Sequence, residues 1–147
     1  MKIINTFKDE DLPFLYSIEK ACFDPTFRWD EATFRVLMKA AREKQYVWII
    51  KNKQTTAGFL LANEDHGKIC IETVDIAPEY WRKGLATKLI NACEKDSRNR
   101  GFKEMKLEVW TDNPAQILYF NLGYRVCGFR RNYYKLRSHA ISMFKKL

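Results

Sequence analysis

The sequence has no apolar run long enough to span a bilayer, and its first twelve residues, MKIINTFKDEDL, turn acidic at once. This N-terminus does not have the pattern of a secretory signal peptide, so we expect a cytoplasmic protein with no membrane segment. The 147 residues are 46% hydrophobic and 30% charged. That length and composition predict a single globular domain over residues 1–147.

Patterns typical of metal sites and disulfide frameworks are missing as well. The two histidines are far apart in the sequence and have no cysteine at ligand spacing, so we expect no metal site. The four cysteines are scattered and contain no C-x-x-C pair; they are Cys22, Cys70, Cys93 and Cys127. In a chain without an export signal, we expect them to be buried thiols rather than two disulfides.

Acidic residues are missing after Asp112. The net charge of the chain is +8, and the segment beyond Asp112 carries most of it. A basic segment of this kind is either a solvated face or a contact site for an anionic partner such as nucleic acid. Its seven cations are Arg125, Arg130, Arg131, Lys135, Arg137, Lys145 and Lys146.

The hydrophobic pattern predicts an α/β fold, a mixed sheet of about seven strands with about four helices. The segment 68–110 is the one clear βαβ unit, with a right-handed crossover expected by rule. Helices are expected from Asp9 to about Cys22, after the capping residue Asp30, from Gly84 to near Gly101, and between Asn113 and Gly123. Strands are expected at residues 2–7, 46–51, 56–63, 68–76, 103–110, 124–130 and 139–146.

The stretch DIAPEYWRKGLATKLI, residues 75–90, takes a strand through a proline and a glycine directly into a helix. Gly84 lets the backbone approach a ligand closely, and Arg82, Lys83 and Lys88 add positive charge. A helix N-terminus exposes N–H groups and the positive end of its dipole, and therefore binds phosphate. Taken alone, however, this pattern is better explained by a plain tight turn.

The surrounding motifs give the turn a more specific interpretation. The run 74–90 resembles the acetyl-CoA motif of the GNAT N-acetyltransferase superfamily, a strand and R/Q-x-x-G-x-G/A before a helix. LEVWTDNPAQILYFNLGY resembles the family's next block, and FKDEDLPFLYSIEKACF, WDEATF and GFRRNYY resemble RimI-type ribosomal-protein N-terminal acetyltransferases. This resemblance runs from the first strand to the last and implies the GNAT acyl-CoA N-acyltransferase fold, with acetyl-CoA as cosubstrate.

The resemblance also implies how acetyl-CoA is held. The backbone of Val74, Asp75 and Ile76 would pair with the pantetheine arm like an added strand, and Asn113 and Tyr119 would flank the thioester. One residue, rather than two, separates Asn113 from the next alanine. Backbone amides would hold the pyrophosphate; they belong to Arg82, Lys83, Gly84, Leu85, Ala86 and Thr87.

Three side chains are candidates for proton transfer. Glu108 lies in the LEV strand motif where RimI-like enzymes carry a base, although it is also explained as an outward glutamate on an alternating strand. Glu72, on the neighbouring strand, is a second candidate base or a member of a cross-strand ion pair. Tyr119 would protonate the leaving thiolate, its alternative being a core tyrosine; a water molecule stays open as the base.

Four aromatic residues are candidates for acceptor binding. Phe27 and Trp29 fall in the loop that lines the acceptor side in this family, and Tyr133 and Tyr134 would close over the acceptor backbone. Ordinary packing is the alternative for Trp29, Tyr133 and Tyr134.

The function predicted from these features is acetyl transfer to the N-terminal amine of a protein or peptide. A small-molecule amine acetyltransferase is the alternative, and a basic nucleic-acid-binding protein with a vestigial CoA site is a third interpretation. The loop before the last strand is shorter and more basic than the RimI pattern. We therefore expect an acceptor that is neutral or acidic beyond its first residue, or one presented on an anionic surface such as ribosomal RNA.

Overall fold

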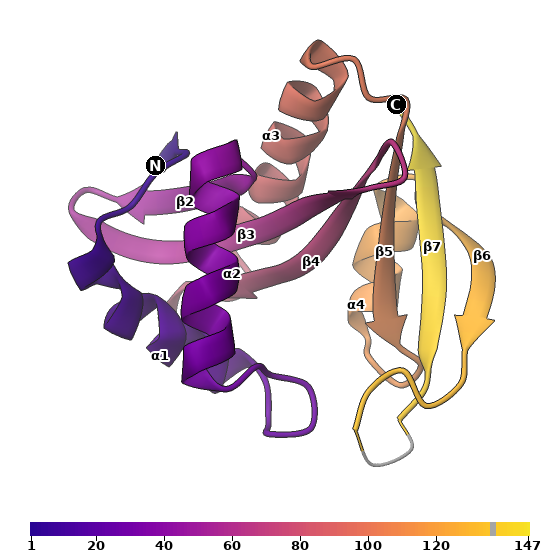
Figure 1. The fold of residues 1–147 in the computed structure, drawn as a ribbon, viewed down its shortest axis with the longest axis horizontal. Coiled ribbons are helices and arrows are strands. Elements are labelled where there is room, and N and C mark those ends of the chain that lie inside the picture. Colours follow the sequence, from indigo (N-terminus) through magenta and orange to yellow (C-terminus); the bar gives the residue numbers. More distant parts are fainter. Residues whose placement is uncertain (136–137) are drawn as a thin grey trace.

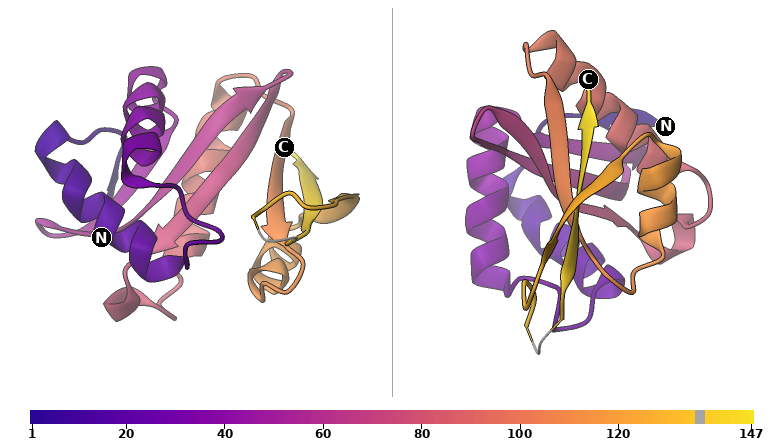
Figure 2. Two further views of the ribbon diagram at one scale, coloured as in Figure 1. Left: turned by 60° about the horizontal axis from the view of Figure 1, so that its bottom comes forward. Right: turned by 90° about the vertical axis from the view of Figure 1, so that its right-hand side faces the viewer.

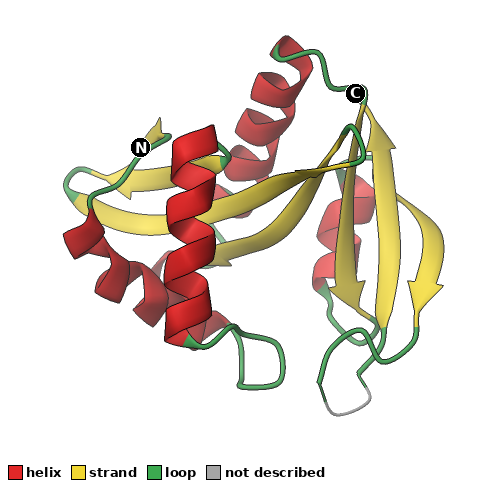
Figure 3. Ribbon diagram, viewed as in Figure 1, coloured by secondary structure: helices red, strands yellow, loops and turns green. Residues whose placement is uncertain are grey.

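The computed structural model describes residues 1–135 and 138–147, which form one seven-stranded sheet flanked by helices (Figures 1 and 3). The strand order is β1-β2-β3-β4-β5-β7-β6. The strands are β1 (Lys2–Ile4), β2 (Val47–Asn52), β3 (Thr55–Asp65), β4 (Lys68–Ile76), β5 (Glu104–Trp110), β6 (Arg125–Arg130) and β7 (Ala140–Lys146). The α-helices in the described residues are α1 (Leu12–Cys22), α2 (Glu31–Lys44), α3 (Leu85–Asn99) and α4 (Ala115–Asn121). This arrangement confirms the predicted mixed sheet.

Local signals explain where the helices begin and end. Asp30 caps α2 as predicted, because its Oδ1 accepts a hydrogen bond from the backbone N–H of Thr33 at 2.8 Å. Gln45 ends that helix in the left-handed conformation, with φ of 60°. The first strand is shorter than expected. It ends at Ile4, and the Asn5 side chain, rather than the backbone, donates to the carbonyl of Val47 at 2.8 Å.

The helices cover both faces of the sheet and complete a core. In Figure 2 (right), α2 lies on one side of the strands, and α3 and α4 lie on the other. Phe34 of α2 packs edge-on against Phe59 of β3, with ring centroids 5.8 Å apart, and both side chains are fully buried. Leu89 and Ile90 of α3 are equally buried from the opposite side. Among the described residues, no helix has both the length and the apolarity that a membrane crossing requires.

The sheet opens between β4 and β5, which are parallel neighbours joined by α3, as predicted for the βαβ unit. Only residues 69–71 of β4 pair with residues 105–107 of β5, and the strands then diverge (Figure 1). On its other edge, β4 carries a bulge at Glu72, because the register with β3 shifts between Thr73 and Ile71. The fold therefore leaves the second half of β4 without a strand partner on the β5 side.

The cysteines are all free, and the prediction that they are buried holds for Cys70 and Cys93. Cys22 is partly buried, whereas Cys127 is exposed. The prediction is wrong for Cys127 because β6 is the edge strand of the sheet, and each of its six residues is exposed.

Candidate active site

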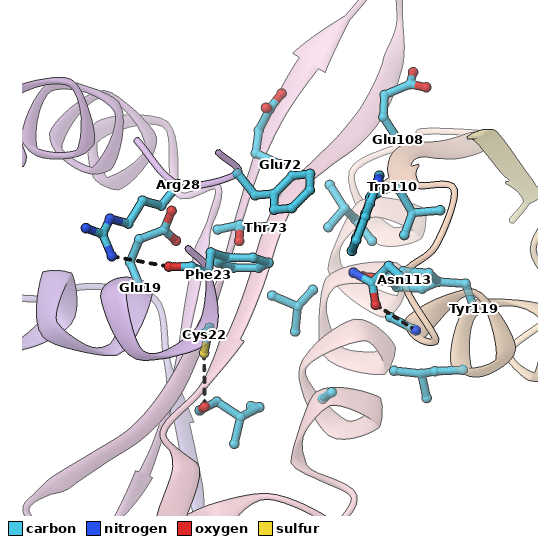
Figure 4. Close-up of a pocket in the computed structure, with 18 of the residues that line it drawn as sticks. Glu19, Cys22, Phe23, Arg28, Glu72, Thr73, Glu108, Trp110, Asn113 and Tyr119 are labelled. Atoms are coloured by element: carbon cyan, nitrogen blue, oxygen red, sulfur yellow. Dashed lines mark hydrogen bonds between the residues drawn. The ribbon is translucent and has the colours of Figure 1, made fainter. Parts of the chain in front are cut away.

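A cavity of about 890 Å³ fills the opening between β4 and β5 (Figure 4). Its walls come from the end of α1 and the loop after it, β4, the turn into α3, the end of β5, α4, and residues 133–135. Most of the residues singled out in the sequence line it together: Phe27, Trp29, Glu72, Val74, Ile76, Arg82, Gly84, Leu85, Ala86, Thr87, Glu108, Asn113, Tyr119, Tyr133 and Tyr134. Two others, Lys83 and Asp75, lie outside this lining. The ammonium group of Lys83 lies 5.8 Å from the ring centroid of Tyr80.

One end of the cavity is formed by the turn into α3. Arg82 and Gly84 both have positive φ, 62° and 74°, and Gly84 is the residue that precedes the helix. The first N–H groups of a helix have no acceptor within it, and here they belong to residues that line the cavity. The donor set therefore suits a pyrophosphate, which would meet backbone N–H groups, the helix dipole and the Arg82 cation.

The open edge of β4 forms the floor of the cavity. The N–H of Ala77 donates to the carbonyl of Ala57 on β3 at 2.8 Å. Backbone groups alternate in direction along a strand, so those of Asp75 also face β3, while those of Val74 and Ile76 face the cavity. The predicted pairing of Asp75 with a pantetheine arm is therefore not what the register offers, because Asp75 is opposite Phe59 of β3.

The carbonyl of Ile76 already has two donors. The indole Nε1 of Trp81 donates to it at 2.6 Å, and the thiol of Cys22 donates at 3.2 Å. A ligand that lies along β4 must share or displace these contacts. Trp81 is thus part of the cavity wall.

The two candidate bases face the cavity from neighbouring strands. Glu108 of β5 has a side chain only 9% exposed; it accepts a hydrogen bond from Ser142, and its Oε1 lies 3.9 Å from Nε of Arg130. Glu72 accepts a hydrogen bond from Asn63 of β3, and burial raises the pKa of Glu72 above its ordinary value. The alternative cross-strand ion pair of Glu72 is not found among the described residues.

Tyr119 approaches the cavity from α4. Burial raises the pKa of Tyr119 to about 12, so the phenol stays protonated and can donate a proton. Its ring also packs edge-on against Tyr124 at 6.1 Å, which fits the packing interpretation, and the catalytic role stays a prediction. Asn113 accepts a hydrogen bond from the N–H of Ala115 at 2.9 Å. With only one residue between Asn113 and Ala115, the Asn113 oxygen thus holds the start of α4.

Aromatic rings close the other end of the cavity. Phe27 lies 4.6 Å from Trp110 of β5 and 5.1 Å from Tyr134, measured between ring centroids. Tyr133 packs edge-on against Tyr134 at 5.0 Å. Trp29 lines the cavity and also packs against the core, so its two interpretations are not separated.

Several lining residues were not predicted from the sequence. Trp110 lies on the same face of β5 as Glu108, so the strand alternation contained the signal that would have found it. Glu19, Cys22 and Phe23 also line the cavity (Figure 4). Nothing in the sequence indicated that the end of α1 packs beside β4, because that contact depends on tertiary structure.

The basic C-terminal segment is partly neutralised by acidic residues from earlier in the chain. Nζ of Lys145 lies 2.8 Å from Oε1 of Glu94 on α3, and Arg130 approaches Glu108. The guanidinium of Arg125 covers the ring of Phe120 at 4.4 Å. Arg137 lies outside the described residues. The segment is therefore less free to meet an anionic partner than its composition indicated.

Comparisons with known proteins show which family the chain resembles. A family model described as the acetyltransferase (GNAT) family matches residues 12–124. Ribosomal protein bS18-alanine N-acetyltransferase of Escherichia coli (strain K12) is 29% identical over 135 residues, which cover 91% of this chain and 88% of that protein.

Solved structures have the same fold. The crystal structure of the ribosomal-protein-S18-alanine N-acetyltransferase from Escherichia coli has a TM-score of 0.84 and 28% identity, over 99% of this chain and 92% of that one. The Salmonella typhimurium protein yncA, solved with its cofactor acetyl-CoA, has a TM-score of 0.80 and 18% identity, over 100% and 94% of the two chains. The fold and the resemblance expected from the motifs are confirmed.

Proposed function

The chain belongs to the acetyltransferase (GNAT) family, and we propose that it transfers the acetyl group of acetyl-CoA to the N-terminal amine of a protein or peptide. The observation that carries this proposal is the meeting of three features in one cavity. These are the start of α3, the open edge of β4, and the proton-transfer candidates Glu108 and Tyr119. The similarity to the Escherichia coli ribosomal protein bS18-alanine N-acetyltransferase supports the same acceptor class.

Acetyl-CoA supplies the acetyl thioester, and the chain positions it. The amides at the start of α3 and the Arg82 side chain would hold the pyrophosphate. The backbone of Val74 and Ile76 would lie along the pantetheine arm, with Asn113 and Tyr119 beside the thioester. In this placement the acetyl group would face the part of the cavity that is lined by the carboxyl groups of Glu108 and Glu72 and by the rings of Phe27, Tyr133 and Tyr134.

Proton transfer would then use side chains on either side of the acetyl group. The incoming amine must be neutral to attack, and an α-amine with a pKa of ~8 is ~10% neutral at pH 7, against ~0.04% for a lysine. Glu108 or Glu72 would accept its proton, directly or through water. Tyr119 would protonate the leaving thiolate. An N-terminal acceptor thus demands less of the base than a lysine does.

A turnover assay with acetyl-CoA and a library of peptides with free N-termini tests this proposal. Lysine peptides with blocked N-termini are the control. We expect acetylation of the first group and little of the second. Activity confined to small-molecule amines would contradict the proposal.

We propose further that the acceptor is neutral or acidic beyond its first residue, or is presented on an anionic surface such as ribosomal RNA. Arg130 and Lys135 lie near Tyr133 and Tyr134 at the acceptor end, where a basic peptide would meet like charges. Free acidic peptides should be acetylated faster than basic ones at low salt, with a difference that shrinks as salt is added. Faster acetylation of basic peptides at every salt concentration would contradict this part. If an intact ribosomal particle is acetylated and no free peptide is, the basic C-terminal segment would be a docking surface. These acceptors are consistent with a cytoplasmic enzyme.

A further inference from the structure

Two buried carboxyl groups lie in contact between α1 and β4, beside the cavity. Glu19 is 1% exposed and Asp75 is 0% exposed. Within the part of the chain that the structure describes, Oε1 of Glu19 and Oδ2 of Asp75 are buried and receive no hydrogen bond from an N–H or O–H group. The carboxyl groups are within hydrogen-bonding reach of each other. One proton held between them would satisfy both atoms, whereas two negative charges at this distance would repel.

The neighbours determine which carboxyl group holds that proton. Burial raises the pKa of Glu19 above its ordinary value, but three neighbours favour its charged form: Asp75, the backbone N–H of Trp29, which donates to Oε2 at 3.4 Å, and the Arg28 guanidinium. Asp75 accepts a hydrogen bond from the Thr73 hydroxyl, but burial and the adjacent Glu19 carboxylate raise the pKa of Asp75 well above its ordinary value. Asp75 therefore carries the proton and donates it to the Glu19 carboxylate.

Two other titratable groups near the pair do not change this balance. Burial raises the pKa of the Cys22 thiol to about 12 and that of the Tyr119 phenol to about 12. Both groups are therefore neutral when the pair titrates.

The pair is connected to the cavity through its immediate neighbours. Glu19 and Thr73 line the cavity, as Figure 4 shows. Asp75 lies between Val74 and Ile76, the two residues whose backbone groups face the open edge of β4. The contact between the carboxyl groups thus joins the end of α1 to the segment of β4 along which a ligand would lie.

We propose that Glu19 and Asp75 share one proton and act as a positioning pair that holds β4 against α1 for the binding of acetyl-CoA. The identity of the ligand rests on the proposed function. Neither carboxyl group is placed at the reacting atoms, so the pair acts through the backbone of Val74 and Ile76. Loss of the shared proton puts two charges in contact in a buried site, which loosens this junction and weakens cofactor binding.

The sign of the pH dependence follows from the raised pKa of Asp75. A carboxyl group that binds its proton more tightly in the folded protein than in the unfolded chain stabilises the fold at low pH. That contribution is lost as the pH rises through the raised pKa. Stability and affinity for acetyl-CoA should therefore fall together on the alkaline side.

The substitution Glu19→Gln isolates the proton. The introduced amide can accept from the Trp29 N–H and donate to an ionised Asp75, which keeps both contacts and the single negative charge of the protonated pair. It has no shared proton to lose. Glu43→Gln, which removes an exposed carboxylate from α2, is the matched control for a change in overall charge.

Two measurements over about pH 6 to 9 test the proposal. Thermal unfolding without ligand should show the wild type and Glu43→Gln losing stability relative to Glu19→Gln as the pH rises. Calorimetry with acetyl-CoA should show the affinity of the wild type, relative to Glu19→Gln, falling by up to about tenfold per pH unit above the pKa of the pair. The comparison between proteins cancels the titration of the phosphates of acetyl-CoA.

Parallel unfolding curves for the wild type and Glu19→Gln would overturn the shared proton. If the unfolding curves of the two proteins diverge with pH but their affinities for acetyl-CoA change in parallel, the positioning role is overturned. If Glu19→Gln does not fold, Thr73→Val tests the shared proton instead. Removing a hydrogen-bond donor to Asp75 should move the loss of stability to higher pH. An unmoved transition would overturn the shared proton. If none of the proteins binds acetyl-CoA at any pH, the proposed function and the positioning role are both contradicted. The unfolding curves would still test the shared proton.

Discussion

At the scale of single residues, the cavity separates the proposed proton donor from the proposed proton acceptors. Tyr119 lies on α4 with its pKa raised to about 12, whereas Glu108 and Glu72 lie on the strands and accept hydrogen bonds from Ser142 and Asn63. A donor and an acceptor held on different elements can act on the two sides of one acetyl group. Each role is tested by a substitution that changes protonation with little change in shape.

Tyr119→Phe should lower kcat by ~10²–10⁴-fold, because it removes a proton donor used in the transition state. The affinity for acetyl-CoA should change little, since the ring stays in place. Steady-state kinetics and calorimetry measure the two effects separately. Tyr46→Phe, which removes a phenol hydroxyl outside the cavity lining, is the control. A kcat within a few-fold of wild type would leave Tyr119 as a packing residue.

Glu108→Gln and Glu72→Gln should separate the candidate bases through the pH dependence of kcat/KM. A general base is active once it has lost its proton, so the rate rises with pH through its pKa. Burial raises the pKa of Glu72, so a rise that depends on Glu72 should lie above the ordinary glutamate range. The variant that abolishes this rise identifies the base. A rise that survives in both variants would assign the proton to water or to the amine itself.

The site residues differ in how far the sequence could predict them. Glu108, Tyr119 and Gly84 stand in motifs with fixed spacing, and the structure brings them to one cavity. Glu19 of α1 and Asp75 of β4 stand in no recognisable sequence motif, because their contact depends on how the helix packs on the strand. The buried proton between them was therefore beyond sequence reasoning.

At the scale of elements, the turn into α3 and the open edge of β4 determine where a cofactor can lie. The turn needs a positive φ at Gly84, and a Cβ atom there would meet no other atom within 4 Å. A side chain at this position would therefore be accommodated by the fold, at a conformational cost of about 1–2 kcal/mol, and would project into open space at the helix N-terminus.

Gly84→Asp should abolish most of the affinity for acetyl-CoA, because it adds a negative charge where a pyrophosphate would bind. Gly84→Asn has almost the same shape, tolerates positive φ and carries no charge, so it is the matched control. Calorimetry on the folded variants should rank the affinities as wild type, then Asn, then Asp. Equal affinities for Asn and Asp would contradict the anion site.

The helices and strands were largely predictable from the sequence, whereas the contacts between them were not. The predicted strand at 68–76 and the predicted cap Asp30 match the structure because period and capping are local properties. The bulge at Glu72 and the separation of β4 from β5 arise from pairing between strands. A single sequence does not specify register, so the cavity could be expected only through the resemblance to a family.

At the scale of the whole molecule, the sheet has two halves that meet over three residue pairs of β4 and β5. A second connection runs from α3 to the C-terminal half. Glu94 of α3 accepts from Tyr124 at 2.8 Å and pairs with Lys145 of β7 at 2.8 Å. The side chain of Glu94 is 6% exposed, so this contact is shielded from water and holds the halves around the cavity.

Lys145→Met should lower the free energy of unfolding by about 1–3 kcal/mol, because it leaves a buried carboxylate without its cation and keeps the length of the side chain. Lys146→Met, at an exposed position on the same strand, should change it by less than about 0.5 kcal/mol. Urea unfolding measures both. Equal effects of the two substitutions would show that the contact with Glu94 adds nothing to stability.

Competition between two amines within one acceptor is a direct test of acetyl transfer to an N-terminal amine. A peptide with a free N-terminus, a neutral or acidic sequence and one internal lysine is incubated with the enzyme and acetyl-CoA. Tandem mass spectrometry then locates the added acetyl group. We expect modification of the α-amine, and its loss in Tyr119→Phe and in Gly84→Asp. Acetylation of the lysine side chain instead, or of neither amine while a small-molecule amine is acetylated, would contradict it.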